Sequence, residues 1–246
     1  MKILLVNDDG IAAKGIKALA EVLAPHHEVV VVAPQGQQSC TSHAVTLHEH
    51  LSYEEVFDYP CKAYALKGTP CDCVKFGMIV LVQGVDLVIS GINDTTNLGT
   101  DVIYSGTVNA AVEAAIAGAK GIAVSVDVVG DDYSYIAQFV KDNLEVLASM
   151  CDGERIVSIN CNSSRREDIK GIKLASCGIR RFDDYYVESA PNRFHLKGSI
   201  INMPSRASAD VIWAERGYLC ISPIKYQFTD EAAMEELDGK MEEICW

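Results

Sequence analysis

The chain has 246 residues, a formal net charge of −13 and a hydrophobic content of 49%. This length is sufficient for one large α/β domain with a substantial core. A surface this acidic repels phosphodiester polymers, which argues against nucleic-acid binding, but a small anionic substrate stays possible because a bound divalent cation can reverse the local field.

The first ten residues predict a buried parallel strand followed by a polar turn. Residues 3–6 form a short apolar run without charge, typical of a strand covered on both faces, and Asn7, Asp8, Asp9 and Gly10 follow it. Two adjacent carboxylates repel each other unless a cation or a proton intervenes. Because ligands of open α/β sheets bind beyond the carboxyl ends of the strands, we interpret Asp8 and Asp9 as ligands of Mg²⁺ or Mn²⁺. The alternative is a polar turn in which an Asp caps the next helix.

A helix and a second strand are expected next. Apolar residues recur at helical spacing and the pattern ends at Pro25; they are Ile16, Leu19, Ala20 and Leu23. Residues 29–33 predict a second buried strand, which Pro34 ends. The polar segment 35–43 follows at the carboxyl end of that strand, and on its own it is typical of an ordinary loop.

The middle of the chain continues with strands and a well-marked helix start. Thr46, Leu47, Tyr64 and Leu66 favour strands between residues 45 and 66. Thr69 is expected to cap a helix that has Pro70 in its first turn. Residues 86–90 predict another parallel strand, which leads into a long polar loop.

A helix N-terminus follows that loop. Residues 107–118 are rich in alanine and predict a helix that Gly118 ends. Ser105, Gly106 and Thr107 therefore stand where free backbone N–H groups and the helix dipole favour an anion. Plain capping by Ser105 is the alternative, but the preceding strand ends near the aspartates, which favours phosphate.

The remaining pattern predicts the fold class. A strand over residues 122–126, a helix and a strand over 156–160 continue the alternation to residue 162; the helix is marked by Ile136, Phe139, Val140, Leu144 and Leu147. This rhythm predicts an α/β, Rossmann-like, mostly parallel sheet with helices on both faces.

The residue pattern changes beyond residue 171, where the alternation of strands and helices ends. Aromatic-bearing strands around residues 180–186 and 194–195 predict a hairpin, and residues 217–223 predict a strand. A terminal helix opens at Thr229, and its apolar face carries Met234, Leu237, Met241 and Ile244. We expect a single domain over 1–246, with a core over 1–175 and an extension over 176–246 that serves in oligomerisation.

Nine cysteines in a chain of this size indicate reduced thiols, and Cys71 and Cys73 have no second pair to complete a zinc pattern. No apolar stretch approaches the roughly 20 residues that cross a bilayer, and the first apolar run lacks the length of a signal peptide. We therefore expect a cytoplasmic protein without a membrane partner.

Several familiar α/β classes do not fit. The sequence lacks the Gly-x-Gly-x-x-Gly, Walker and Gly-x-Ser-x-Gly motifs. Haloacid-dehalogenase-like phosphatases need Asp-x-Asp, whereas Asp8 and Asp9 are adjacent. A two-component receiver needs a phosphorylatable Asp at the end of a later strand, where this chain has Asn93.

Five ordered motifs instead resemble the SurE family of 5′/3′-nucleotidases, and the match runs through nearly the whole chain. They are Val-Asn-Asp-Asp-Gly at the front, Pro34 followed by Ser39, Gly-Thr-Pro-x-Asp-Cys-Val, Ser-Gly-Ile-Asn-x-x-x-Asn-Leu-Gly-x-Asp, and Tyr-Ser-Gly-Thr-Val-x-Ala-Ala.

The resemblance implies a divalent-metal-dependent phosphomonoesterase that hydrolyses nucleoside 5′-monophosphates and also 3′-monophosphates. The implied ligands of one Mg²⁺ or Mn²⁺ per subunit are Asp8, Asp9, Ser39 and Asn93. Phosphate would be held by Asn97, Ser105, Gly106 and Thr107. The resemblance also implies a homodimer or homotetramer in which the C-terminal hairpin and tail are exchanged.

Two catalytic roles are hypotheses, and the chain departs from the family pattern at several positions, including Cys40 and Thr95. As a hypothesis, Asp9 orients or deprotonates the attacking water, while His43 is a candidate proton donor or, alternatively, a loop histidine without catalytic role. Cys40 and Thr95 stand where the family usually has glycine, which tolerates unusual backbone angles. The alternatives to a nucleotidase are a broad acid phosphatase or exopolyphosphatase on the same site, and a non-enzymatic receiver-like module that binds Mg²⁺ and phosphate.

Overall fold

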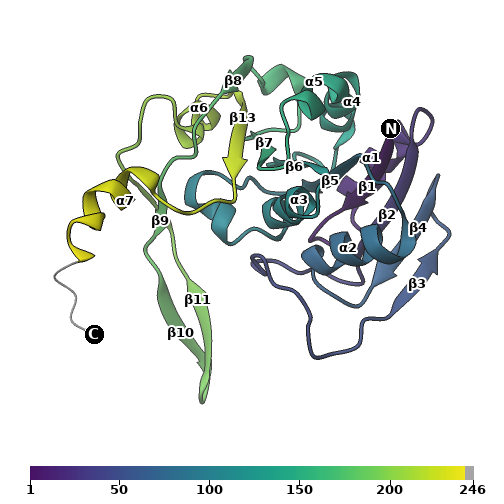
Figure 1. Cartoon of the computed structure of the whole chain (residues 1–246), viewed down its shortest axis with the longest axis horizontal. Helices are drawn as coiled ribbons and strands as arrows, with labels where there is room; N and C mark the ends of the chain where they lie inside the picture. The colour runs from purple at the N-terminus through teal and green to yellow at the C-terminus, as the bar shows by residue number, and fades with distance from the viewer. Residues whose placement is uncertain (242–246) are drawn as a thin grey trace.

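A nine-stranded sheet runs through the structure, a computed structural model that describes residues 1–241 apart from the side chains of residues 202 and 235 (Figure 1). The order is β3-β4-β2-β1-β5-β6-β7-β13-β8. The strands are β1 (Lys2–Val6), β2 (Glu28–Pro34), β3 (Tyr53–Val56), β4 (Lys62–Leu66), β5 (Leu87–Asn93), β6 (Lys120–Val126), β7 (Arg155–Cys161), β8 (Ile172–Leu174) and β13 (Leu219–Lys225). All neighbours pair in parallel except β3 with β4 and β7 with β13, so the mostly parallel sheet is confirmed.

Helices cover both faces of this sheet. The first face packs against α1 (Lys14–Leu23), α4 (Ser134–Asp142) and α5 (Leu144–Ser149), and the second against α2 (Pro70–Phe76) and α3 (Gly106–Ile116). The other helical elements are η1 (Gly77–Leu81), η2 (Gly99–Ile103), η3 (Arg166–Asp168), α6 (Asp210–Glu215) and α7 (Glu231–Asp238).

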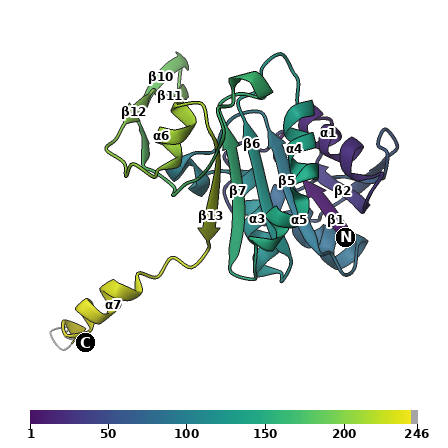
Figure 2. The ribbon, with the colours of Figure 1, turned by 90° about the horizontal axis from the view of Figure 1, so that it is seen from above.

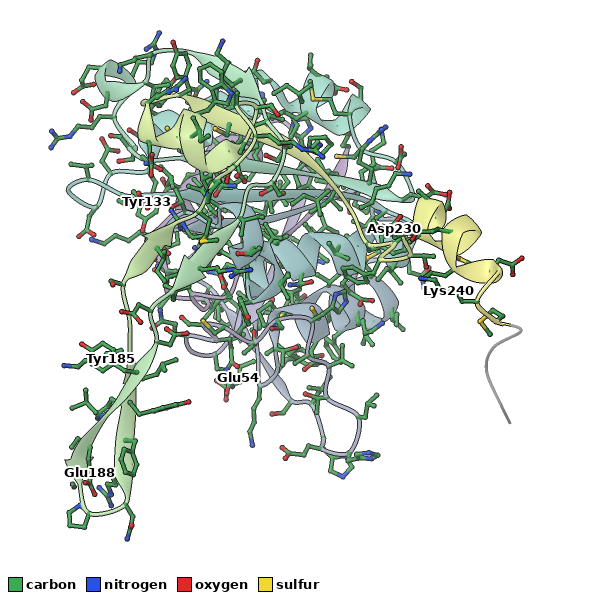
Figure 3. All side chains as sticks on the ribbon, turned by 90° about the vertical axis from the view of Figure 1, so that its left-hand side faces the viewer. Glu54, Tyr133, Tyr185, Glu188, Asp230 and Lys240 are labelled. Carbon is green, nitrogen blue, oxygen red and sulfur yellow. The ribbon has the colours of Figure 1, made fainter. Side chains whose placement is uncertain are left out.

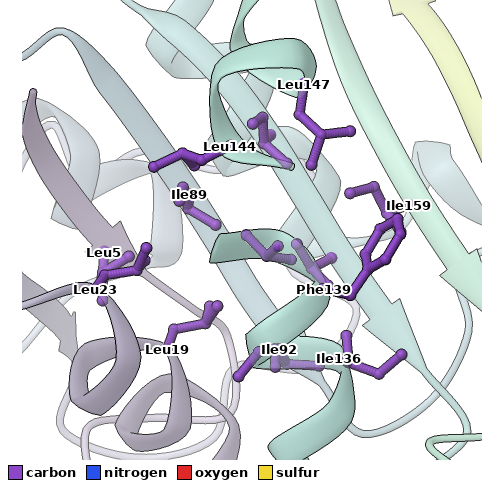
Figure 4. Packing of buried hydrophobic residues seen from close by; sticks show 14 of the residues in the cluster. Leu5, Leu19, Leu23, Ile89, Ile92, Ile136, Phe139, Leu144, Leu147 and Ile159 are labelled. Carbon is purple, nitrogen blue, oxygen red and sulfur yellow. The ribbon is translucent and has the colours of Figure 1, made fainter. Parts of the chain in front are cut away.

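The central strands are buried on both faces, as their uninterrupted apolar runs predict. In β1, Ile3 and Leu5 point into the cluster under α1 and α4, while Leu4 and Val6 point into the cluster under α2. Figure 4 shows the first cluster, where Leu5 lies with Leu19 and Leu23 of α1. Successive residues of one strand therefore hold together two different layers.

Strands β1 and β5 are neighbours from which the chain departs in opposite directions. The connection after β1 leads to β2 on one side, and the connection after β5 leads to β6 on the other. Such a switch point opens a crevice at the carboxyl ends of the two strands, where ligands of open α/β sheets bind. Asp8 and Asp9 follow β1, and Asn93 is the last residue of β5.

The C-terminal extension leaves the sheet as a two-part arm. β9 (Arg180–Phe182) pairs with β12 (Ile200–Asn202), and β10 (Tyr185–Ala190) pairs with β11 (Arg193–Lys197), both antiparallel. Figure 3 shows the β10–β11 hairpin reaching away from the body, with Tyr185 partway along it and Glu188 near its tip. The chain then returns through β13 to the sheet, and α7 lies apart from it (Figure 2).

Three local predictions need correction, and one strand is not predicted from the sequence. Thr46 and Leu47 lie in a loop, because the carboxylate of Asp72 accepts both the N–H and the hydroxyl of Thr46 in place of a neighbouring strand. The helix expected through Leu147 is two helices, which meet at Asn143, and the side-chain amide of Asn143 donates to Phe139 O.

The other two differences lie in the last third of the chain. The three-residue strand β8 was not foreseen, because its apolar side chains are mostly exposed at the sheet edge. The terminal helix is capped by Asp230 and begins at Glu231, so Thr229 does not open it. The prediction for Ile244 lies outside the described residues.

Other local predictions are confirmed. α1 ends before Pro25, and Thr69 caps α2 through a reciprocal capping box with Asp72. Cys71 and Cys73 are buried free thiols. Among residues 1–241, no helix is both long and apolar enough to cross a membrane.

We predict that Gly15→Ala destabilises the fold through the contact that seats α1 at the switch point. A Cβ at residue 15 would lie 2.0 Å from the carbonyl oxygen of Ile92, and backbone cannot yield as a side-chain end does. The free energy of unfolding in urea should fall by about 2–3 kcal/mol. A Cβ at Gly153 would meet nothing within 4 Å, so the control Gly153→Ala should change that energy by less than about 0.5 kcal/mol.

Candidate active site

The side chain of Asn7 closes the turn after β1. Asn7 Oδ1 accepts from the Gly10 N–H at 3.1 Å, and Asn7 Nδ2 donates to Gly10 O at 2.9 Å. The N-cap of α1 is Ala13, which makes no side-chain cap. The alternative in which Asp8 or Asp9 caps the helix is therefore wrong, and both carboxylates are free for another use.

Asp8 is buried, with 6% of its surface exposed, and is fastened to the start of α3. The Thr107 hydroxyl donates to Asp8 Oδ1 at 2.5 Å. Burial raises the pKa of Asp8, and the hydrogen bonds from the Thr107 side chain and backbone oppose that rise. The Thr107 hydroxyl thus already has a partner in Asp8, and phosphate binding by Thr107 stays a prediction.

Asp9 is half-buried beside two other acids. Burial, followed by the charges of Asp8 and Asp94, raises the pKa of Asp9 to about 7. Asp94 was missed in the sequence, although its place directly after Asn93 at a strand end was a usable signal. A divalent cation in contact with Asp8 and Asp9 would favour their ionised forms, so the electrostatics of the pair fit a metal.

Asn93 at the end of β5 has its amide oriented by the next loop. Its Nδ2 donates to Thr95 O at 2.6 Å and lies 3.3 Å from Thr95 Oγ1. The amide oxygen is thereby turned away from Thr95, and amide oxygen is a ligand that hard cations accept. Thr95 is not among the residues with positive φ, so its backbone does not require glycine.

Ser39 is exposed in a segment that contacts Asp8. Gln38 directly precedes Ser39, and its backbone N–H donates to Asp8 O at 2.7 Å. Cys40, directly after Ser39, has a left-handed φ of 56°, a conformation that glycine tolerates better than a residue with a Cβ. The structure thus brings the Ser39 segment to the same corner as the carboxylates.

The start of α3 is built as the sequence predicts, with little free space. Ser105 is the N-cap, and its Oγ accepts from the Val108 N–H at 3.1 Å. A Cβ on Gly106 would lie 2.9 Å from Asp8 Cβ and 3.0 Å from Thr41 Oγ1. Only glycine therefore fits between Asp8 and Thr41.

Asn97 and the loop after it are fixed from several sides. The Asn97 N–H donates to Asn160 Oδ1 at 2.7 Å, and Asn97 Nδ2 donates to Ser125 Oγ at 2.8 Å. These bonds hold the residue at the carboxyl ends of β6 and β7. One N–H of the side-chain amide is thus committed to Ser125, which leaves its second N–H and the amide oxygen for other partners.

The loop between Asn97 and Ser105 is clamped by the C-terminal extension, which the sequence did not predict. Buried Asp210 accepts from the Gly99 N–H at 2.9 Å, and Arg180 Nη1 lies 2.7 Å from Asp101 Oδ2. Gly99 and Asp210 are 111 residues apart in the sequence, and Asp101 and Arg180 are 79 residues apart, so no local pattern could have revealed these contacts.

His43 binds a buried carboxylate on α3. His43 Nε2 lies 2.7 Å from Glu113 Oε2, and Lys75 Nζ lies 2.6 Å from Glu113 Oε1. Burial raises the pKa of Glu113, but the hydrogen bonds and charges of His43 and Lys75 outweigh it and leave the pKa below its ordinary value. The proton-donor role of His43 stays a prediction, and the structure shows another use of its Nε2 atom.

The described part of the chain, residues 1–241, contains no group of three or more His, Cys, Asp or Glu side chains arranged to hold a metal ion. The predicted ligand set has only two such side chains, Asp8 and Asp9, and adds a hydroxyl and an amide oxygen. It is an all-oxygen set, which suits Mg²⁺ or Mn²⁺ better than zinc.

Comparison with known proteins gives one family. The family model of survival protein SurE matches residues 3–184. The 5′-nucleotidase SurE of Clostridium botulinum (strain Eklund 17B / Type B) is 37% identical, over 96% of this chain and 98% of that relative. The 5′-nucleotidase SurE of Fervidobacterium nodosum is 40% identical, over 97% of this chain and 96% of that relative.

A solved structure agrees in fold. The crystal structure of the SurE protein from Aquifex aeolicus superposes with a TM-score of 0.82 at 30% identity, covering 98% of this chain and 100% of that one. The match extends through the arm and the return strand, beyond the residues that the family model covers. Sequence motifs, sheet topology and the residues at the switch point thus lead to one conclusion: the chain belongs to the SurE family.

Proposed function

We propose that this protein is a divalent-metal-dependent phosphomonoesterase that hydrolyses nucleoside 5′-monophosphates, and also 3′-monophosphates, to nucleoside and phosphate. The observation that carries the proposal is the convergence of Asp8, Asp9 and Asn93 at the switch point of a chain 37–40% identical to proteins named 5′-nucleotidase SurE. The free state of all eight described cysteines supports a reducing, cytoplasmic setting.

One Mg²⁺ or Mn²⁺ would be held by Asp8, Asp9, Ser39 and Asn93. When bound, such an ion polarises a phosphoryl oxygen and neutralises charge that develops during transfer. The oriented amide of Asn93 and the raised pKa of Asp9 support this ligand set.

The chain's own groups would bind and orient the phosphate at the start of α3. Ser105 Oγ accepts from Val108, so its hydroxyl proton is available for a phosphate oxygen. The Gly106 N–H lies in the first turn, where the helix dipole favours an anion. Asn97 would complete the cradle, and Asp9 would orient the attacking water or accept its proton.

We predict metal-dependent phosphate release that requires Asp9. With Mn²⁺ or Mg²⁺, the protein should release phosphate from a panel of nucleoside 5′- and 3′-monophosphates, and chelator should stop it. Asp9→Asn should lower kcat/KM by roughly 100- to 10,000-fold because a general base is lost. Calorimetry with Mn²⁺ would show whether the variant still binds metal.

The same panel should include polyphosphate and simple phosphate esters, which separate a nucleotidase from a broad phosphatase. Absence of metal-dependent turnover on every substrate would contradict the proposal. Full turnover by Asp9→Asn with metal bound would contradict the role of Asp9 alone.

We predict that Gly106→Ala lowers kcat/KM about 100-fold, because a Cβ there displaces Asp8 or Thr41 and a shift of about 1 Å at a reactive centre has that cost. Steady-state kinetics with a nucleoside monophosphate measure it, and circular dichroism confirms that the variant is folded. Gly153→Ala is the matched control and should keep the activity of the unmodified protein. A fully active Gly106→Ala variant would show that this packing does not position the site.

We also propose that the protein forms a homodimer or homotetramer through its C-terminal extension. On the β10–β11 hairpin, Tyr186, Phe194 and Leu196 share one face by their pairing register, and each is more than half exposed. Three large apolar side chains on one face of an isolated hairpin are typical of a subunit contact.

We predict that Tyr186→Ser combined with Phe194→Ser shifts the protein to monomer, because apolar area that drives association is removed. Size-exclusion chromatography with light scattering at micromolar concentration gives the mass. Phe57→Ser changes a residue that is 85% exposed outside the extension and is the control. A monomeric unmodified protein, or an unchanged mass in the double variant, would argue against this interface.

A further inference from the structure

The segment that carries Ser39 is fastened on both sides. Before Ser39, the Gln38 N–H donates to Asp8 O at 2.7 Å. After it, the Ser42 N–H donates to Tyr104 O at 3.0 Å. The first bond ties the segment to the turn after β1, and the second ties it to the residue before the α3 N-cap. Ser39 itself is exposed, so its position depends on these flanking attachments.

The backbone of this short segment needs support from its surroundings. Cys40 and Ser42 have φ values of 56° and 51°, in the left-handed region that residues with a Cβ rarely adopt. Such conformations cost free energy and persist only where neighbouring contacts over-determine them. The contact made by the next residue, His43, is therefore important for the shape of the segment.

His43 reaches a buried, well-compensated carboxylate. The Glu113 side chain is 4% exposed, and each of its two oxygens has one cationic or protic partner: Lys75 Nζ at 2.6 Å from Oε1 and His43 Nε2 at 2.7 Å from Oε2. A carboxylate buried to this degree holds its partners in place, because leaving it unpaired is costly. Lys75 comes from α2 and does not belong to the Ser39 segment.

Helix α3 connects this attachment to Asp8. Thr107 in the first turn of α3 holds Asp8 Oδ1, and Glu113 lies six residues further along the same helix. Asp8 and the Ser39 segment are thus fastened to one rigid element at two points. A helix keeps the separation of two such points fixed, because its backbone hydrogen bonds resist stretching.

We infer that His43 is a positioning residue of the metal site: its contact with Glu113 sets where Ser39 stands relative to Asp8. The inference rests on the proposed function, because it needs Ser39 to be a metal ligand. It assigns to His43 a task different from proton donation. Glu113 serves as the anchor, and Lys75 compensates its charge without touching the segment.

The test compares His43→Ala with the matched control Lys75→Met, which removes the other partner of the same carboxylate. Titration calorimetry of metal-free protein gives the Mn²⁺ affinity without any turnover. Kinetics give the Mn²⁺ concentration for half-maximal activity, and separately kcat and KM for a nucleoside monophosphate at saturating Mn²⁺. Thermal unfolding in chelator reports the stability of each variant.

We expect His43→Ala to weaken Mn²⁺ binding about tenfold, the low end of the effect of residues that orient metal ligands. The kcat at saturating Mn²⁺ should stay within about threefold of the unmodified protein, because the loaded site does the same chemistry. Lys75→Met should lower the unfolding temperature in chelator at least as much and leave the Mn²⁺ affinity unchanged. His43→Gln keeps a donor and should recover part of the affinity.

Several outcomes would overturn the inference. They are an unchanged Mn²⁺ affinity in His43→Ala, an equal loss of affinity in Lys75→Met, and a loss of kcat at saturating Mn²⁺ with unchanged affinity, which would indicate a proton donor instead. An unmodified protein that binds no Mn²⁺ overturns both this inference and the proposed metal dependence. Binding of Mn²⁺ without nucleotide hydrolysis overturns only the proposed function, and calorimetry then still decides on His43.

Discussion

The repulsion between Asp8 and Asp9 is the constraint on which the site depends. Two adjacent acids follow the end of β1, and burial, followed by the charges of Asp8 and Asp94, raises the pKa of Asp9 to about 7. Local contacts hold the turn and the Asp8 carboxylate in place against this repulsion. Asn7 closes the turn with Gly10, and the Thr107 hydroxyl binds Asp8 in a corner where a Cβ on Gly106 would not fit. The carboxylates are thereby held close together in spite of their charge.

Helix α3 has a double role in this arrangement. Its first turn holds Asp8, and its side chain Glu113 holds His43 at the end of the Ser39 segment. The loop that leads into it is fixed in turn by the extension, through Arg180 on Asp101. A helix N-terminus that faces a buried carboxylate also supplies a favourable field for that charge. The same element thus sets the shape and part of the electrostatics of the site.

The sequence predicted the frame of this protein but not the contacts that complete it. Buried strands were predictable because an uninterrupted apolar run has few other stable uses, as residues 3–6 show. The helix starts at Thr69 and Ser105 were predictable from capping chemistry, which is local. Thr46 was assigned to a strand wrongly, because its hydrogen bonds go to Asp72, 26 residues away. Pattern and propensity contain no information on such a partner.

The same distinction applies to the candidate site. Asp8 and Asp9 could be proposed because ligands of open α/β sheets bind beyond the carboxyl ends of the strands, whereas Asn93 was proposed from the resemblance of its motif to the SurE family. By contrast, the bond from the Thr107 hydroxyl to Asp8 joins residues 99 positions apart, and the general properties of a helix N-terminus do not predict it. The use of Glu113 could not be foreseen either, since a Glu on an alanine-rich helix is more often a solvated residue than a buried anchor.

On the proposed function, the negative charge of the molecule indicates a second role for a bound metal ion. Asp8, Asp9 and Asp94 present three acidic groups in one corner, within a chain of net charge −13. A nucleotide phosphate is itself an anion, so this corner opposes its approach unless positive charge is supplied locally. The first turn of α3 carries only a partial positive charge, and the Thr107 backbone in that turn already stabilises the Asp8 carboxylate. On the proposed function, a divalent cation held by Asp8 and Asp9 would supply that positive charge, so it would favour substrate binding as well as the chemistry.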